Sequence, residues 1–511
     1  MKQSDRNQQS LPRFWIYKKF NRRIFLALLF FMLGSRKGIK AQKIDTIRCE
    51  WCWLGAVTDN SLTIKAKLNN QVIPGKNYVR VFYHQTPDFS VNNRAIAKVL
   101  ATSLDDRIAT FNLVDLAEDT TYYYVIVADG RRYPTQGSLQ FKTVKVHQPY
   151  SFAIACSSCA GGTLAQYGTS GVSNHRVFDT IRQYQYRDRI DRKKKNLALF
   201  VHMGDFHYRN DFPFLGLKEN RLDDYRRNYD LVMNQSRQKN LYQNIPLAYV
   251  WDDHDYGTND SDGSYRLKYV ASKAYRERVP SYPLVERLNQ AKAKGAIYQS
   301  FVIGRVRFVM TDSRFDRDAI NAADNLNKTL LGNNQREWLL QQFKIGKKHQ
   351  QNRREGLTIW VNTIPWIAAK DNFKTDSWNR FHRERTVIAN FIKENQIDRL
   401  LMISGDAHML ALDDGMAGTA NSYATNGGGS FPVIQAASLD SSRSFKGGPY
   451  NGDKYIVSSQ VKSKNGAIPG KGQWGLLNFV DDGKAIEVKV ELKRMEDTLI
   501  RHSFIFPTVY S

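Results

Sequence analysis

The chain is 511 residues long, which is more than one hydrophobic core ordinarily accommodates, so the length predicts two domains. Hydrophobic residues make up 42% and aromatic residues 12% of it, a content that excludes an intrinsically disordered protein. The formal net charge is +26, but the basic residues are spread rather than clustered. The charge therefore predicts a general attraction to anionic substrates or an anionic envelope surface, and it indicates no specific nucleic-acid partner.

Residues 1–41 have the pattern of a secretory signal peptide. Basic residues between Arg13 and Arg23 precede the apolar run 24–33, and a small-residue exit follows near Ala41. The run is shorter than the roughly 20 apolar residues that a transmembrane helix needs. We expect a secreted, periplasmic or cell-surface protein with no stable transmembrane span after processing. An uncleaved anchor or a core helix is the alternative.

Short β-branched or aromatic runs alternate with turn residues between residues 45 and 146. The runs cover residues 61–68, 78–84, 108–116, 120–130 and 138–146. This spacing predicts a small antiparallel β-sandwich domain over 45–146. Because the region holds no cluster of His, Asp and Glu, a binding or positioning role is expected for it.

The pattern changes at Pro149 and predicts an α/β domain over 150–511. Apolar strands are expected at 151–155, 196–204, 246–252, 305–312, 357–363 and 398–405. Helix-like segments alternate with them, as at Asn334–Phe343, where apolar residues recur at helical spacing. Ligands of α/β sheets bind beyond the carboxyl ends of the strands, so the functional site is expected there.

Polar residues with metal-binding side chains follow five of these strands. The segments are Cys156–Cys159, Gly204–Tyr208, Trp251–Asp255 with Asn259 and Asp260 close behind, Thr311–Arg314, and Gly405–His408. Carboxylate, imidazole, phenolate and thiolate together favour a transition metal over magnesium alone. Two metals that share an aspartate would activate water and neutralise an oxyanion, as in-line phosphoryl displacement requires.

Each of these residues alone is weak evidence. A single Asp or Asn at a strand end is more often a turn or cap residue, and His202 and Tyr256 are interpreted as packing side chains. The order and spacing of the whole set carry the prediction.

The four cysteines form two C-x-x-C pairs, Cys49/Cys52 and Cys156/Cys159. A four-thiolate zinc site is one interpretation of such pairs, and disulfides in an exported protein are the other. The sequence leaves both open.

Five motifs in this order resemble the PhoD-like alkaline phosphatases of the calcineurin-like metallophosphoesterase superfamily, which is related to the purple acid phosphatases. They are GDFHY (204–208), WDDHDYGTND (251–260), MTDSRFDR (310–317), LLGNNQREWL (330–339) and ISGDAH (403–408). Trp53–Lys67 and Leu116–Gly130 resemble the amino-terminal domain of these enzymes. The resemblance implies a layered α/β/β/α sandwich preceded by a small all-β sandwich domain.

The resemblance also implies a set of metal ligands. Asp205 would bridge two metals, and Tyr208 would bind ferric iron as a phenolate. Asp253 and Asp406 would be further ligands, with His408 on the iron side. Asn259 would be an oxygen ligand or a phosphate contact. Cys156 is our choice as thiolate ligand, with Cys159 as the alternative. The implied metals are Fe³⁺ and Ca²⁺, with Zn²⁺ or Mn²⁺ as further options.

Other residues would act on the substrate by the same resemblance. His254 would stabilise the transition state or protonate the leaving group. Arg314 would bind phosphate, since guanidinium suits bidentate phosphate recognition, and Asp312 would orient it. Trp378 matches an aromatic position in a helical segment that covers the pocket.

The sequence thus predicts a secreted, metal-dependent alkaline phosphatase that hydrolyses phosphate esters by attack of a metal-bound hydroxide. A phosphodiesterase acting on phospholipid, a nucleotide or nucleic acid, or an envelope polymer is the alternative within enzymes. A non-catalytic surface binding protein is the alternative outside them.

Overall fold

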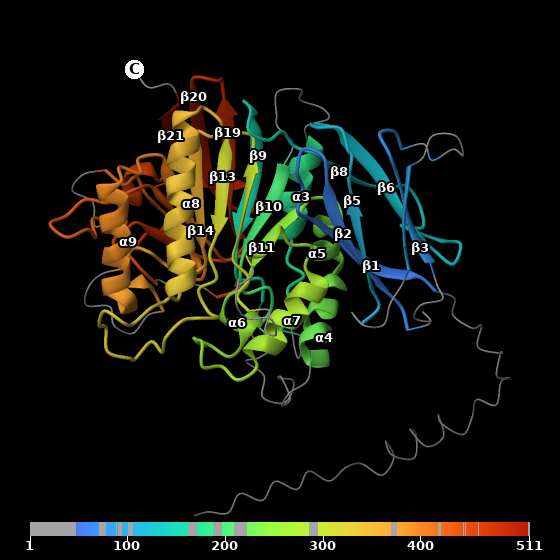
Figure 1. Ribbon diagram of the computed structural model, residues 1–511, viewed down its shortest axis with the longest axis horizontal. Coiled ribbons are helices and arrows are strands. Elements are labelled where there is room, and N and C mark those ends of the chain that lie inside the picture. Colours follow the sequence, from blue (N-terminus) through green and yellow to red (C-terminus); the bar gives the residue numbers. More distant parts are fainter. Residues whose placement is uncertain are drawn as a thin grey trace, which may run out of the picture. The chain divides into compact units, whose positions relative to one another are not determined.

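The computed structural model describes the chain from residue 47 to residue 508, with several gaps (Figure 1). The described ranges are 47–70, 78–87, 89, 95–100, 106–161, 171–187, 197–208, 222–285, 295–368, 376–416, 421–442, 444, 446–457 and 459–508. The predicted signal peptide lies outside these residues. Within the same ranges, no helix combines the length and the apolar character that crossing a bilayer requires.

The central sheet has nine strands among the described residues, in the spatial order β21-β20-β19-β9-β10-β11-β1-β2-β5. These are β1 (Cys49–Gly55), β2 (Leu62–Leu68), β5 (Ile108–Leu113), β9 (Phe152–Ser157), β10 (Leu197–Met203), β11 (Leu247–Val250), β19 (Gln473–Asp481), β20 (Ala485–Arg494) and β21 (Asp497–Pro507). β9, β10 and β11 run parallel, so the segments that follow them leave the sheet at one edge.

The second sheet has the spatial order β12-β13-β14-β15-β17-β16-β18 in the described residues. Its strands are β12 (Gln299–Ile303), β13 (Val306–Met310), β14 (Leu357–Asn362), β15 (Leu400–Ser404), β16 (Met409–Asp413), β17 (Val433–Ala436) and β18 (Ala467–Pro469). β13, β14 and β15 are parallel to one another. Their carboxyl ends therefore also meet at one edge.

Helices cover the outer faces of the two sheets (Figure 1). α3 (Val177–Arg187), α4 (Leu222–Met233), α5 (Ser236–Tyr242) and α7 (Lys268–Arg278) lie beside the central sheet, and α8 (Asn333–Gln351) and α9 (His382–Glu394) lie beside the second. Short helices are α6 (Asp253–Tyr256), η2 (Trp378–Phe381) and η3 (Gly452–Tyr455).

Alternation along the strands explains why both faces of the second sheet are buried. Phe308 of β13 belongs to the core shared with the central sheet, and its ring centroid lies 6.2 Å from that of Phe479 on β19. The next residue, Val309, belongs to a different core, which contains Leu339 of α8 and Ile388 of α9. Successive side chains of a strand point to opposite faces, so such a strand is apolar throughout. The predicted α/β/β/α fold is confirmed.

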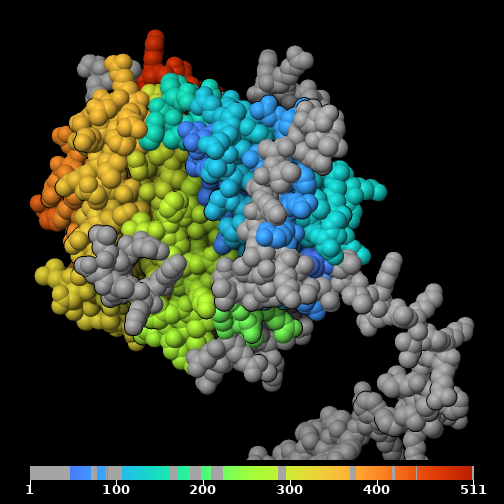
Figure 2. Space-filling model, turned by 45° about the vertical axis from the view of Figure 1, so that its right-hand side comes forward, coloured from blue at the N-terminus to red at the C-terminus, as the bar shows by residue number. Residues whose placement is uncertain are grey.

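The N-terminal strands form part of two sheets. β3 (Tyr78–His84), β4 (Ala95–Leu100), β6 (Thr121–Ala128), β7 (Arg131–Tyr133) and β8 (Leu139–Lys142) make a separate antiparallel sheet. In contrast, β1, β2 and β5 extend the central sheet, because β1 pairs with β11 at Gly55 and Leu247. The indole N–H of Trp53 also donates to the carbonyl oxygen of Arg278 at 2.6 Å. Figure 2 shows the blue and cyan N-terminal residues beside the yellow-green residues of the middle of the chain.

Two glycines allow the backbone to turn sharply where β10 and β15 end. Gly204 has φ +88°, and a Cβ atom on it would lie 2.3 Å from Cβ of Asp252. A Cβ atom on Gly405 would lie 2.7 Å from Oγ of Ser158. Both positions precede an aspartate of the predicted site, and only a residue without a side chain fits at such close approaches.

We expect Gly204→Ala to destabilise the fold much more than Gly137→Ala. Gly137 also has a positive φ, of +66°, but a Cβ atom there meets nothing within 4 Å. The control should cost about 1 kcal/mol from backbone strain, whereas Gly204→Ala adds a steric clash and should cost at least about 3 kcal/mol. Urea unfolding measures the free energy of unfolding of each variant. Equal decreases for Gly204→Ala and Gly137→Ala would contradict the steric role of Gly204.

Candidate metal centre

Asp205 lies at the centre of the candidate site. It follows β10 in a left-handed conformation with φ +55° and is almost completely buried. Its Oδ2 accepts hydrogen bonds from the Tyr208 hydroxyl at 2.7 Å and from the Cys159 thiol at 3.4 Å. Its Oδ1 lies 3.3 Å from the backbone nitrogen of His254. Burial and the nearby Asp253 carboxylate raise the pKa of Asp205 well above its usual range.

One group of candidate ligands combines sulfur, nitrogen and oxygen. Ligand atoms of Cys159, Asp205 and His408 all lie within 4.8 Å of one another. The Tyr208 hydroxyl joins the group, because it lies 3.0 Å from Nε2 of His408. Nδ1 of His408 lies 2.6 Å from the carbonyl oxygen of Ser442 and must donate to it, which leaves Nε2 of the neutral ring with a free lone pair. Burial lowers the pKa of His408 to about 3, so the ring is neutral at physiological pH.

A second group of candidate ligands consists of carboxylates. Oxygens of Asp253, Asp260 and Asp376 lie within 4.8 Å of one another. Asp205 forms two more such groups, one with Asp253 and His254 and one with Asp252 and Asp406. Asp205 thus lies between the sulfur-containing group and the carboxylates, where a bridging ligand would have to be.

Arg314 compensates part of this negative charge from inside the protein. Its side chain is fully buried; Nε donates to Oδ1 of Asp252 at 2.5 Å, and Nη1 lies 2.8 Å from Oδ2 of Asp376. Burial alone would raise the pKa of Asp253 and of Asp376. Arg314 opposes it together with His254 and Lys446 at Asp253, and together with Arg317 and Lys446 at Asp376, so that both pKa values lie below the usual range. For Asp252, burial dominates over Arg314 and raises the pKa to about 7.

Lys446 supplies a second cation to the site. Its Nζ lies 2.8 Å from Oδ1 of Asp406, and about a quarter of its side chain is exposed, 26%. Burial raises the pKa of Asp406 to about 6, although Lys446 opposes that shift. Unlike Arg314, Lys446 therefore reaches the carboxylates from the solvent side.

The residues present fit multivalent cations. Oδ2 of Asp406 and Oδ2 of Asp252 are buried and have no hydrogen-bond partner among the described residues. Buried carboxylate oxygens without a partner are costly unless a cation binds them. The thiol, phenol and imidazole of the first group suit a transition metal, and the oxygens of the second group suit a harder cation such as calcium.

Several residues predicted from the sequence lie together in this site. They are Asp205, Tyr208, Asp253, His254, Arg314, Asp406 and His408. Asp312 lies just behind them and accepts a hydrogen bond from the backbone N–H of Arg314 at 2.9 Å, which fits its predicted orienting role. His202 and Tyr256 are buried among aromatic rings, as expected of packing side chains.

Cys156 lies outside the site, and its alternative Cys159 lies in it. Cys156 is still within β9 and faces β19, where a Cβ on Gly475 would lie 2.8 Å from its sulfur. The loop after β9 then pairs with the loop after β10, and the Cys159 N–H donates to the carbonyl of Gly204 at 3.1 Å. This pairing brings Cys159 to Asp205. All four cysteines are free thiols in the structure.

Three other predicted roles need correction. Asn259 is exposed and belongs to none of the ligand groups, which the next residue, Asp260, joins instead, so of its two predicted roles only the phosphate contact stays a prediction. Trp378 is fully buried, with its ring centroid 5.1 Å from that of Trp366, so it packs in a core rather than covering a pocket. Arg314 contacts carboxylates and has no exposed surface with which to bind phosphate.

Sequence reasoning assigned no role to Asp252, Asp260, Asp376 or Lys446. Asp252 and Asp260 are part of the quoted motif WDDHDYGTND, so the motif contained both residues but did not indicate what each of them does. Asp376 and Lys446 stand in segments with no recognised motif, and only the fold brings them to the strand ends.

Comparison with known proteins shows the family to which the chain belongs. A family model described as PhoD-like phosphatase matches residues 178–465. Alkaline phosphatase D of Bacillus subtilis (strain 168) is 23% identical over 274 residues, an alignment that spans 45% of this chain and 45% of that protein. A solved structure described as that of PhoD has a TM-score of 0.61 at 16% identity and covers 90% of each chain, which shows the shared fold. Because the family model matches more than half of the sequence, the chain belongs to the PhoD-like phosphatase family.

Proposed function

We propose that this protein is a metal-dependent alkaline phosphatase that hydrolyses phosphate esters. The observation that supports this best is the position of Asp205, which contacts Cys159 and Tyr208 on one side and forms groups with other aspartates on the other. Family membership and the name of the Bacillus relative agree with it.

The proposed metal sites follow from the two kinds of ligand. Cys159, Asp205, Tyr208 and His408 would hold Fe³⁺, and Asp253, Asp260 and Asp376 would hold Ca²⁺. Zn²⁺ or Mn²⁺ could occupy the same positions, although these ligands match them less well than Fe³⁺ and Ca²⁺. The metals would supply a water of lowered pKa and would neutralise charge that develops on the phosphate.

His254 is the proposed proton donor to the leaving-group oxygen. It belongs to α6 immediately after the carboxylate pair, and its ring centroid lies 4.0 Å from that of Tyr208. This contact orients the imidazole toward the candidate ligands. A positioned histidine typically contributes a factor of about 10² to 10⁴ to the rate.

Lys446 would take the phosphate-binding role predicted for Arg314, and Arg314 would have a positioning role instead. Arg314 would position Asp252, Asp253 and Asp376, whose oxygens lie 2.5 to 3.8 Å from its guanidinium nitrogens. Lys446, which is partly exposed, would contact the phosphate of the substrate.

Export is part of the proposal and rests on the signal-peptide pattern of residues 1–41. A mature N-terminus near residue 42, determined by mass spectrometry of the protein from culture medium or periplasm, would support it. An intact N-terminus in the cytoplasmic fraction would contradict it.

Asp205→Asn should lower turnover of p-nitrophenyl phosphate by at least about 10³-fold, because the shared carboxylate charge is lost. Asp129→Asn is the matched control, since Asp129 is an exposed turn residue with φ +48° that Asn tolerates. Circular dichroism checks that both variants fold. Activity of folded Asp205→Asn near the control level would refute the assignment. Faster hydrolysis of bis(p-nitrophenyl) phosphate by the unaltered enzyme would instead favour a phosphodiesterase.

Cys159→Ser should lose tightly bound iron and the visible absorption of a phenolate–iron complex, whereas Cys156→Ser should keep both. The expected difference arises because the Cys159 thiol contacts Asp205 while Cys156 is buried in β9. Elemental analysis and absorption spectra measure it. Equal iron content in the two variants would remove Cys159 from the ligand set.

Lys446→Met should raise KM for a phosphate monoester about tenfold, because a charge-assisted contact to phosphate is lost. Lys471→Met is the control, since Lys471 lies 3.8 Å from Asp440, and its side chain is similarly exposed at 31%. Steady-state kinetics gives both KM values. An unchanged KM in Lys446→Met would leave this lysine without a role in substrate binding.

A further inference from the structure

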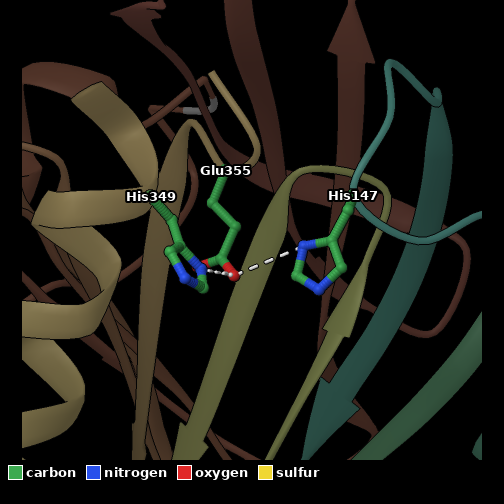
Figure 3. A group of neighbouring side chains, drawn as sticks. All are labelled: His147, His349 and Glu355. Atoms are coloured by element: carbon green, nitrogen blue, oxygen red, sulfur yellow. Dashed lines mark hydrogen bonds and ion pairs between the residues drawn. The ribbon is translucent and has the colours of Figure 1, made fainter. Parts of the chain in front are cut away.

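A second group of metal-binding side chains lies far from the strand ends that form the candidate active site. His147 lies in the segment between β8 and β9, His349 in the last turns of α8, and Glu355 just before β14. Figure 3 shows the three side chains pointing toward one another. Glu355 and His147 precede their strands, whereas the active-site residues follow theirs. The group therefore lies at the amino ends of the parallel strands, the opposite edge.

The donor atoms of this group are close enough for one small cation. One ring nitrogen of His147, one of His349 and a Glu355 oxygen all lie within 4.8 Å of one another. Glu355 Oε1 is 2.7 Å from Nδ1 of His349 and 3.5 Å from Nδ1 of His147. The two imidazole rings are nearly perpendicular, at 85°, with centroids 5.9 Å apart. Both rings face the Glu355 carboxylate, which lies between them (Figure 3).

His147 is held in place with its Nδ1 unsatisfied. That nitrogen is buried and has no hydrogen-bond partner among the described residues. The backbone has φ +57°, an uncommon conformation for a histidine, and its N–H donates to the carbonyl of Gly304 at 2.7 Å. Burial outweighs the Glu355 charge and lowers the pKa of His147, which favours the neutral ring whose lone pair can bind a metal.

We propose that His147, His349 and Glu355 form a binding site for a divalent transition metal, with Zn²⁺ as the best match. Two imidazoles and one carboxylate, with water as a fourth ligand, are a recognised zinc donor set. Tetrahedral ligands at about 2.0–2.1 Å from zinc lie about 3.3 Å apart, near the His147–Glu355 separation. His349 and Glu355 would separate by about half an ångström on binding. The histidine side chains are 29% and 22% exposed, so solvent reaches the open position.

Arg307 fixes the carboxylate and sets the expected strength of the site. Its Nε donates to Glu355 Oε2 at 2.7 Å, and its Nη2 donates to Oε1 at 2.7 Å. Oε1 is therefore shared between Arg307 and the two histidines, and Nη2 of Arg307 also lies 3.4 Å from Nδ1 of His349. The positive charge of Arg307 opposes a second cation, so the site should bind zinc exchangeably rather than permanently.

A metal here would connect three separate parts of the chain. His147 belongs to the connection between the N-terminal strands and β9, while His349 and Glu355 belong to α8 and the start of β14. Val146 also forms a bridge with Gly304, at the turn that precedes β13. Zinc would strengthen this connection at the edge of the sheets opposite the candidate active site.

Equilibrium dialysis of the full protein against Zn²⁺, followed by elemental analysis, tests the proposal. We compare the unaltered protein with His147→Asn, which tolerates the positive φ, and with His349→Gln, which keeps a hydrogen-bonding amide beside Glu355. His84→Gln is the control, because His84 lies on β3 in the N-terminal sheet. Each site variant should bind one zinc equivalent fewer than the unaltered protein and the control, with phosphatase activity unchanged. Equal zinc content in all four proteins would overturn the proposal and leave a metal-free hydrogen-bonded cluster.

A second measurement needs no variant. Diethyl pyrocarbonate modifies neutral histidine rings, and mass spectrometry locates the modified residues. Zn²⁺ should protect His147 and His349 but not His84 in the unaltered protein. Equal modification of His147 and His349 with and without Zn²⁺ would also overturn the proposal.

Discussion

The concentration of buried carboxylates at one sheet edge is the constraint on which the rest of the structure depends. Asp205, Asp252, Asp253, Asp376 and Asp406 are all buried together, and such charges are stable only when cations compensate them. Arg314 compensates the negative charge from the protein interior, and Lys446 compensates it from the solvent side. The backbone at this edge is also unusual, since Asp205, Asp406 and His408 all have positive φ angles. Uncommon backbone conformations of this kind cluster at functional sites.

The two-sheet architecture explains how residues far apart in the sequence meet at this edge. β9, β10 and β11 of the central sheet, and β13, β14 and β15 of the second, are each parallel, so their following loops converge. The two ends of the strands differ in chemistry as a result. The carboxyl ends collect aspartates, and the amino ends collect the histidine pair with Glu355 and Arg307.

The sequence predicted the fold and most of the site because both depend on local patterns. Apolar strands alternating with helices indicated the α/β fold, and polar residues directly after strands indicated Asp205, Asp253 and His408. The wrong assignments arose where the exact end of a strand determines whether a side chain reaches the site. β9 continues through Ser157, so Cys156 stays in the core and Cys159 reaches the site. Asp376 and Lys446 were beyond reach, because their positions depend on tertiary contacts alone.

The shared central sheet has a consequence for any attempt to isolate the catalytic part. β11 is a buried, apolar strand whose outer partner is β1, so removing the N-terminal strands would expose its unpaired backbone groups. Exposed apolar edge strands pair with other chains and promote aggregation. The N-terminal strands thus act as a permanent cap on that edge. A shortened chain that begins near Pro149 should be insoluble for this reason, even with every candidate metal ligand intact.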